Sequence, residues 1–136
     1  MDMKKIVVAA ALAVLTTTSA GVAHAGLKTF FGANVVKNAD GSGRANGSMG
    51  TARNSANNIE YVSCYAQGFS TGNPHAACIV RDSASEVGIC HATTDAQLNA
   101  IRSASTDSYV YFEWDTTGAC TYIYVSHSST YEPKAP

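Results

Sequence analysis

The chain has 136 residues, of which 46% are hydrophobic and 14% are charged, and its formal net charge at pH 7 is −1. A length of this order predicts one domain with a modest core, which covalent cross-links would help to stabilise. The near-neutral charge and the lack of a basic stripe argue against nucleic acid as a partner.

The first 25 residues have the pattern of a secretory signal peptide. Lys4 and Lys5 give it a positive start, residues 6–15 form an unbroken apolar run, and Ala23-His24-Ala25 matches the A-x-A cleavage signature. The run is shorter than the roughly 20 residues that span a bilayer, and no second apolar run follows. We therefore expect an exported protein, periplasmic or extracellular, with no membrane span once residues 1–25 are removed.

Residues 26–58 are expected to form an extended N-terminal arm that is partly flexible. Its first part contains apolar residues that could form a short strand or cover a sheet edge, namely Phe30, Phe31, Val35 and Val36. Residues 37–56 are dense in Gly, Ser, Asn and Ala, which bury little surface, so we expect a flexible arm or a long irregular loop there. A weak edge strand near residues 47–53 is the alternative.

Residues 38–43 have the spacing of the first half of a calcium-binding loop. Position twelve of such a loop would be Met49, where Glu is required, so a turn is favoured over a calcium site.

The stretch from residue 59 to residue 94 predicts three consecutive antiparallel strands, at residues 59–69, 76–81 and 86–92. Gly, Asn, Pro, Asp and Ser fill the two turns between them. Folding the chain about these turns places Cys64 opposite Cys78 and Cys78 opposite Cys90. Three cysteines are therefore expected near one rung of a sheet.

The four cysteines all follow the predicted signal peptide, and an even number in an exported chain predicts two disulfides. Four cysteines allow three pairings. Because directly opposed neighbours can be bridged, we favour Cys78–Cys90 together with Cys64–Cys120. The pairing of Cys64 with Cys78 and of Cys90 with Cys120 is a close alternative.

Residues 95–102 predict a short helix packed on the sheet. Thr94 suits the N-cap position, and Gln97 stands where a capping box needs Glu or Gln. Leu98 and Ile101 are three residues apart and lie on one face of the helix.

Residues 107–114 and 119–126 are rich in Tyr, Val, Ile, Phe and Trp and predict a hairpin. Strict alternation along the second strand puts Cys120, Tyr122 and Tyr124 on one face. Residues 128–136 predict a polar, frayed tail. Together the elements predict a mainly β fold: a small antiparallel sheet made of a three-stranded meander, a short helix and a C-terminal hairpin, with two disulfides, in a domain spanning residues 59–127.

Two groups of side chains have the composition of a chemical site. One has the ligand types of a zinc site: His75, Cys78, Cys90 and His91. Export to an oxidising compartment favours disulfides over zinc for these cysteines. The other is Glu113 with Asp115, whose spacing along a strand puts both carboxylates on one face, as glycoside hydrolysis would need. A solvated strand end is the commoner interpretation of such a pair, so no cofactor and no catalytic residue is predicted beyond these weak candidates.

The aromatic residues of the predicted strands are the most suggestive feature for binding. They are Tyr61, Tyr65, Tyr109, Tyr111, Trp114, Tyr122 and Tyr124. On an exposed sheet face such rings offer apolar area with little side-chain entropy to lose, so they can stack on sugars or anchor a protein partner. Ordinary cross-strand packing in a small core is the competing interpretation.

Two segments carry a resemblance. The segment GTARNSANNIEYVSC (residues 50–64), followed by the paired-cysteine hairpin and by SYVYFEWDTTGACTYIYVS (residues 108–126), resembles a group of small exported, cysteine-containing proteins of myxobacteria and other proteobacteria. The resemblance covers residues 47–134 and implies bacterial origin and export. That group has no established activity, so the resemblance implies no catalytic or binding residue.

These features predict an exported, non-enzymatic binding protein that recognises a protein or a glycan through an aromatic sheet face or its loops. A hydrolase inhibitor or an immunity protein is a specific version of this hypothesis. One alternative is a structural matrix or surface-assembly protein, in which residues 37–56 pair with a neighbour's sheet edge. A second alternative is a small secreted hydrolase that uses Glu113 and Asp115.

Overall fold

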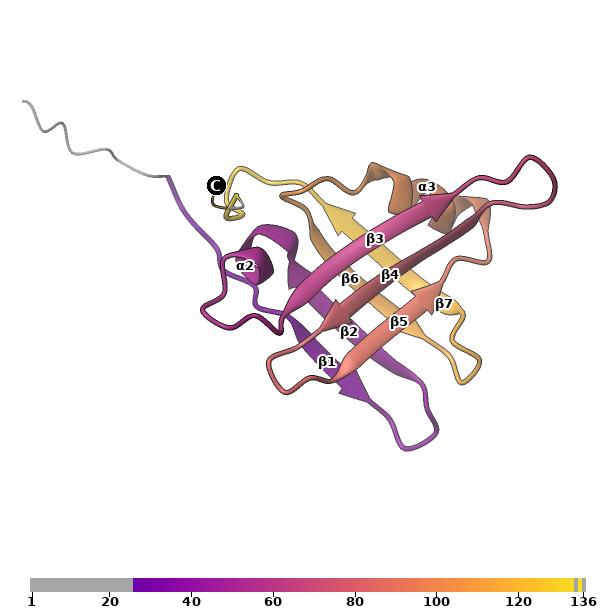
Figure 1. Cartoon of the computed structure of the whole chain (residues 1–136), viewed down its shortest axis with the longest axis horizontal. Coiled ribbons are helices and arrows are strands. Elements are labelled where there is room, and N and C mark those ends of the chain that lie inside the picture. The colour runs from indigo at the N-terminus through magenta and orange to yellow at the C-terminus, as the bar shows by residue number, and fades with distance from the viewer. Residues whose placement is uncertain (1–25, 134, 136) are drawn as a thin grey trace, which may run out of the picture.

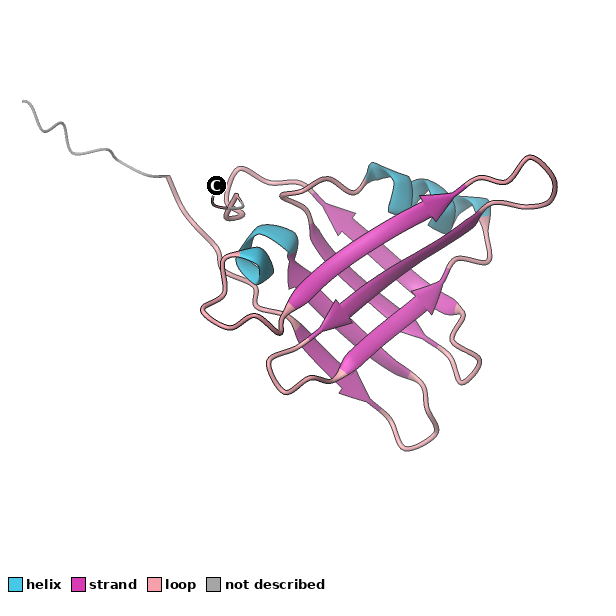
Figure 2. Ribbon diagram, in the orientation of Figure 1, coloured by secondary structure: helices cyan, strands magenta, loops and turns pink. Residues whose placement is uncertain are grey.

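The computed structural model describes residues 26–133 and 135, and the predicted signal peptide lies outside the described residues. The mainly antiparallel β fold with two disulfides is confirmed (Figure 2). In chain order the elements are β1 (Asn34–Lys37), β2 (Gly43–Ser48), α2 (Met49–Arg53), β3 (Tyr61–Gln67), β4 (His75–Arg81), β5 (Val87–His91), α3 (Asp95–Ser103), β6 (Tyr109–Trp114) and β7 (Cys120–Ser126).

The seven strands form two sheets that pack face to face. One has four strands in the order β1-β2-β6-β7, and the other has three in the order β3-β4-β5. Figure 1 shows the three-stranded sheet in front of the four-stranded sheet, with the strands of the two sheets crossing, as in orthogonally packed sandwiches. α2 and α3 lie where the chain passes from one sheet to the other. Within residues 26–133 and 135, no helix has both the length and the apolar character that crossing a membrane requires.

The predicted meander is confirmed in register. Cys64 pairs with Cys78 across β3 and β4, and Cys78 pairs with Cys90 across β4 and β5, so the three cysteines lie on one rung.

The predicted helix is also confirmed. Its capping box is complete: the Thr94 hydroxyl accepts a hydrogen bond from the Gln97 backbone amide, and the Gln97 side chain accepts one from the Thr94 amide.

The prediction of a flexible arm over residues 37–56 is wrong. β2 is an interior strand of the four-stranded sheet, paired with β1 on one side and β6 on the other. Both glycines of β2 are needed for packing: a Cβ at Gly43 would overlap the indole of Trp114, and a Cβ at Gly47 would come within 2.8 Å of the Val62 side chain. On β5, a Cβ at Gly88 would come within 2.8 Å of the same indole. Since β1 and β2 pair within the chain, residues 37–48 do not supply the free segment that the matrix hypothesis needs.

The C-terminal segment is not a frayed tail as far as the structure describes it. Tyr131 forms a parallel bridge with Thr29, and its ring lies 6.0 Å from that of Phe31. The Asn54 side chain donates a hydrogen bond to the Pro133 carbonyl at 2.9 Å. A Cβ at Gly50 would overlap the backbone carbonyl of Glu132, so this segment packs directly against α2.

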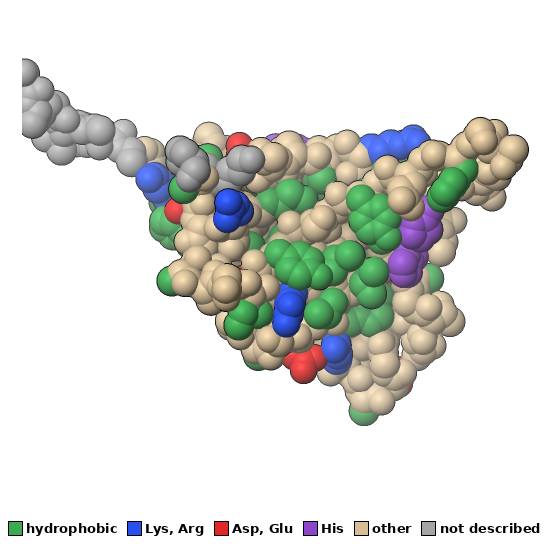
Figure 3. Space-filling model, in the orientation of Figure 1, with side chains coloured by type: hydrophobic (Ala, Val, Ile, Leu, Met, Phe, Trp, Pro, Cys, Tyr) green, Lys and Arg blue, Asp and Glu red, His purple; other side chains and the backbone are tan. Residues whose placement is uncertain are grey.

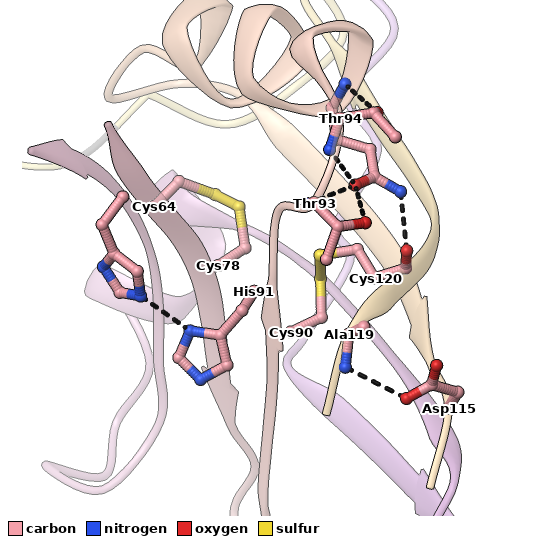
Figure 4. Close-up of a disulfide and its surroundings, with 11 residues drawn as sticks. Cys64, Cys78, Cys90, His91, Thr93, Thr94, Asp115, Ala119 and Cys120 are labelled. Carbon is pink, nitrogen blue, oxygen red and sulfur yellow. Dashed lines mark hydrogen bonds between the residues drawn. A yellow bond between two sulfur atoms is a disulfide. The ribbon is translucent and has the colours of Figure 1, made fainter. Parts of the chain in front are cut away.

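The favoured cysteine pairing is wrong, and the close alternative is correct. Cys64 is bonded to Cys78 within the three-stranded sheet, whereas Cys90 is bonded to Cys120 of β7 and so links the two sheets (Figure 4). A parallel bridge between His91 and Ala119, in which His91 N donates to the Gly118 carbonyl at 3.0 Å, brings β5 and β7 together at this corner. Cys90 therefore meets a partner from the other sheet, although Cys78 lies opposite it on the rung.

A β-bulge at the start of β7 changes which side chains face outward. Trp114 pairs with Cys120 and Glu113 pairs with Tyr122, so Thr121 is an extra residue in the ladder. Because one extra residue reverses the alternation of faces, the prediction that Cys120 shares a face with the two following tyrosines is wrong. Cys120 is 4% exposed and reaches Cys90 in the interior, whereas Tyr122 is 51% exposed on the outer face.

Candidate functional site: the aromatic face of the four-stranded sheet

The outer face of the four-stranded sheet carries four of the predicted binding-face tyrosines. Tyr109 and Tyr111 come from β6, whose alternate residues Val110 and Phe112 are fully buried in the core. Tyr122 and Tyr124 come from β7, and they are 51% and 45% exposed. We refer to these four tyrosines, together with Phe31 and Tyr131, as the aromatic face.

The rings of the aromatic face contact one another in two groups. Tyr111 and Tyr122 form an edge-on pair with centroids 6.0 Å apart. Tyr109 lies in the second group, 4.9 Å from Phe31, 5.9 Å from Tyr131 and 6.4 Å from Tyr124. Phe31 and Tyr131 are not among the residues predicted from the sequence for a binding face. Only the docking of the N-terminal and C-terminal segments on each other brings them there, and no local pattern signals it.

Polar side chains continue the outer face beyond the aromatic residues. Asn46 pairs in register with Tyr111, and Arg44 pairs with Glu113. At the end of the sheet next to the β1–β2 turn lies an open groove of about 300 Å³, lined by Val36, Asn38, Ser42, Gly43, Arg44, Glu113, Trp114 and Thr121. The outer face therefore combines apolar rings with amide, hydroxyl and charged groups.

Two phenols of the aromatic face, those of Tyr109 and Tyr111, have a raised pKa. Burial is the main cause that raises the pKa of Tyr109, followed by the neighbouring phenols of Tyr131 and Tyr124. The hydrogen bond that Tyr111 Oη donates to the Glu113 carboxylate is the main cause that raises the pKa of Tyr111. At neutral pH both side chains are uncharged, and the Tyr111–Glu113 bond holds the carboxylate beside the groove.

The structure separates the other predicted aromatic residues from this face. Tyr61 and Tyr65 lie on β3, in the three-stranded sheet, so the seven predicted residues do not form one surface. Trp114 is only 7% exposed, and its indole Nε1 donates a hydrogen bond to the Gly41 carbonyl at 2.9 Å. Trp114 is therefore a core residue whose edge reaches the groove, and its predicted role on an exposed face is wrong.

The two predicted catalytic carboxylates have different surroundings. Glu113 lies on the outer face and accepts the hydrogen bond from Tyr111. The Asp115 carboxylate closes the β6–β7 turn, where its Oδ1 accepts bonds from Thr117 N at 2.8 Å, Thr117 Oγ1 at 2.6 Å and Ala119 N at 3.1 Å. These turn contacts give Asp115 a structural role in the hairpin.

We expect the Asp115 turn to make stability depend on pH in the acid range. Hydrogen bonds from Thr117 lower the pKa of Asp115 below the ordinary value of an aspartate side chain. A carboxyl whose pKa is lowered on folding contributes stability above its unfolded pKa and loses it as the pH falls through the folded pKa. In Asp115→Asn the amide oxygen can still accept these bonds, so the fold should persist while the unfolding free energy falls less steeply below pH 4 than in wild type. Urea unfolding from pH 2 to pH 6 measures this, and equal slopes would contradict it.

The predicted metal ligands do not form the predicted sites. Cys78 and Cys90 are bonded to other cysteines, which leaves His75 and His91 without thiolate partners. In the calcium-like loop, the Asp40 carboxylate accepts bonds from Ser42 N at 3.0 Å and Ser42 Oγ at 2.6 Å and so serves the β1–β2 turn. Across the described residues, no three His, Cys, Asp or Glu side chains are grouped so that they could hold a metal ion.

Comparison of the chain with protein-family models, with curated proteins and with solved structures finds no match. Its function is therefore inferred from its own surface.

Proposed function

We propose that this protein is an exported, non-enzymatic binding protein of bacterial origin that recognises a glycan on the aromatic face of its four-stranded sheet. The observation that carries the proposal is the set of tyrosines turned outward on β6 and β7, next to a polar groove on the same face. Two disulfides and a predicted signal peptide support export to an oxidising compartment.

A sugar ring matches the two halves of this face. Its apolar C–H surface can lie against the rings of Tyr122 and Tyr124, which lose little side-chain entropy on binding because each has only two rotatable bonds. Its hydroxyls can exchange hydrogen bonds with Asn46 and with the side chains that line the groove. Ligand sites generally combine an apolar surface with a few placed polar groups in this way.

The charges beside the groove favour a sugar without net charge. Arg44 and Glu113 are cross-strand partners, so one charge of each sign borders the ligand. An acidic polysaccharide would gain from Arg44 and lose at Glu113. A protein partner remains the competing class, because tyrosine and arginine are also enriched in protein interfaces.

We expect Tyr122→Ala and Tyr124→Ala each to weaken glycan binding by about tenfold or more, since a buried aromatic anchor contributes about 1.4 kcal/mol or more to binding. Tyr61→Ala is the matched control. Tyr61 is 40% exposed, close to the 45% of Tyr124, but it lies on the other sheet, so its replacement should leave affinity unchanged. A glycan array with the wild-type protein selects the ligand, and calorimetry with the selected oligosaccharide measures the three variants.

Two results would overturn the proposal. One is a glycan bound with the same affinity by wild type and by the Tyr122→Ala/Tyr124→Ala double variant. The other is an array with no bound glycan together with a protein captured from the native envelope by wild type and lost by the double variant. The second result would assign the same face to a protein partner.

A further inference from the structure

The far side of the molecule carries a histidine pair that the proposed glycan site does not use. His75 of β4 and His91 of β5 lie on the outer face of the three-stranded sheet. His75 Nε2 and His91 Nδ1 face each other at 3.1 Å, and the ring centroids are 5.2 Å apart. Figure 3 shows histidine side chains gathered at one end of this face, beside its hydrophobic surface.

The distance between the facing nitrogens suits two ligands of one metal ion. Metal–imidazole bonds of about 2.0–2.1 Å that meet at 90° to 110° place the two nitrogens about 2.8–3.4 Å apart. The 3.1 Å separation of His75 Nε2 and His91 Nδ1 lies within this interval. Turning each ring away from the line that joins the two nitrogens would direct both lone pairs at a shared ion.

The strand pairing places the two histidines side by side, and several contacts fix the backbone at His91. His91 directly follows Cys90, which is bonded to Cys120 (Figure 4). The backbone amide of His91 donates a hydrogen bond to the Gly118 carbonyl. His91 pairs in register with Ala77, two residues beyond His75, so the two rings are diagonal neighbours on one face. The ring of Tyr65 lies 5.8 Å from that of His75.

The hydrogen between the two rings can move to an outer ring nitrogen. One facing nitrogen now carries a hydrogen and donates it to the other. The outer nitrogen of each ring makes no hydrogen bond to another described residue, so it can carry that hydrogen after a change of tautomer. Both facing nitrogens are then free to bind a metal ion.

We propose that His75 Nε2 and His91 Nδ1 together bind a divalent ion of the nickel, copper and zinc group. Imidazole ligands suit these ions, and the general order of stability for a given nitrogen site makes Cu²⁺ the tightest of them. Two protein ligands leave the other coordination positions to water. Calcium and magnesium prefer oxygen ligands and should not bind.

The test titrates Cu²⁺ into the disulfide-bonded protein, prepared without a histidine tag and freed of metal with a chelator. Calorimetry should give one ion per chain, and the electron paramagnetic resonance spectrum should show coupling to two nitrogens. His75→Gln and His91→Gln should each weaken Cu²⁺ binding by about tenfold or more. Removing only a hydrogen-bond partner that orients a metal ligand already lowers metal affinity about 10- to 100-fold, so removing the ligand itself should lower it at least as much. His127→Gln is the matched control, since His127 lies on a different segment and bonds to Ser108.

Far-ultraviolet circular dichroism of each variant separates lost binding from lost folding. As a second measurement that needs no variant, the imidazole proton resonances of His75 and His91 should shift on addition of Zn²⁺ while that of His127 does not. Equal Cu²⁺ affinity in wild type and in the folded double variant His75→Gln/His91→Gln would overturn the proposal. Zn²⁺-induced shifts confined to other residues would do the same.

Discussion

Trp114→Ala should lower the free energy of unfolding by about 3–5 kcal/mol, the range measured for replacement of large buried aromatic side chains. Its indole is only 7% exposed, contacts the ring of Phe112 and donates a hydrogen bond to the Gly41 carbonyl. It also fills the space that Gly43 and Gly88 leave open between the two sheets. Since small domains have total stabilities of about 5–15 kcal/mol, the loss should be visible as a large shift in the urea midpoint, followed by circular dichroism.

A second substitution tests whether the glycines and the indole depend on each other. Gly88→Ala alone should destabilise the protein, because its new Cβ would lie 2.8 Å from the Trp114 ring. In the Trp114→Ala background the same methyl group enters a vacated space, so its cost should shrink or change sign. Tyr122→Ala is the control for a solvent-facing aromatic residue and should cost less than about 1 kcal/mol. Additive costs for Gly88 and Trp114 would contradict the packing described here.

Replacing both members of the Cys90–Cys120 disulfide by Ala should cost about 4 kcal/mol, and doing the same for Cys64–Cys78 should cost about 3 kcal/mol. The first bridge closes a separation of 30 residues and the second a separation of 14, so the first removes more conformational freedom from the unfolded chain. Cys90–Cys120 also joins the two sheets, whereas Cys64–Cys78 joins strands that are already paired.

Equilibrium unfolding of the two double variants in urea measures this difference. Alanine is the suitable replacement because Cys78 and Cys90 are fully buried, and a serine hydroxyl would need a hydrogen-bond partner there. Mass spectrometry of the non-reduced protein, digested between the cysteines, checks the pairing itself. A greater loss for Cys64–Cys78 than for Cys90–Cys120 would contradict the assignment of the inter-sheet bridge as the more stabilising one.

The predicted catalytic and metal sites show where local sequence patterns fail. Glu113 and Asp115 have a spacing that suggests a carboxylate pair, but the turn after β6 takes up the Asp115 oxygens. His75 and His91 were grouped with cysteines that in fact form bridges to other segments, and their contact with each other depends on the register of β4 against β5. Sixteen positions separate the two histidines in the chain, so no local periodicity predicts this contact.

The amino-acid sequence by itself determined most of the local elements after residue 59. The meander with its cysteine rung, the capped helix and the tyrosine-rich hairpin follow from turn residues, capping residues and alternation, which act between neighbours in the chain. Local preference was enough for the meander and the C-terminal hairpin, where each strand's partner is the next strand along the chain, but not for β1 and β2, because the glycines and small residues of β2 carry no strand signal.

Only the tertiary structure decided which sheet each strand joins, which cysteine meets Cys120, and why a strand can be built from glycine, alanine and serine. The Trp114 indole, from a distant segment, leaves space for no residue larger than glycine at position 43. The bulge at Thr121 turns Cys120 inward and the following tyrosines outward. Packing depends on the volumes and directions of all neighbouring side chains at once. The residue pattern of one strand does not contain the volumes or directions of the side chains on the strand that packs against it.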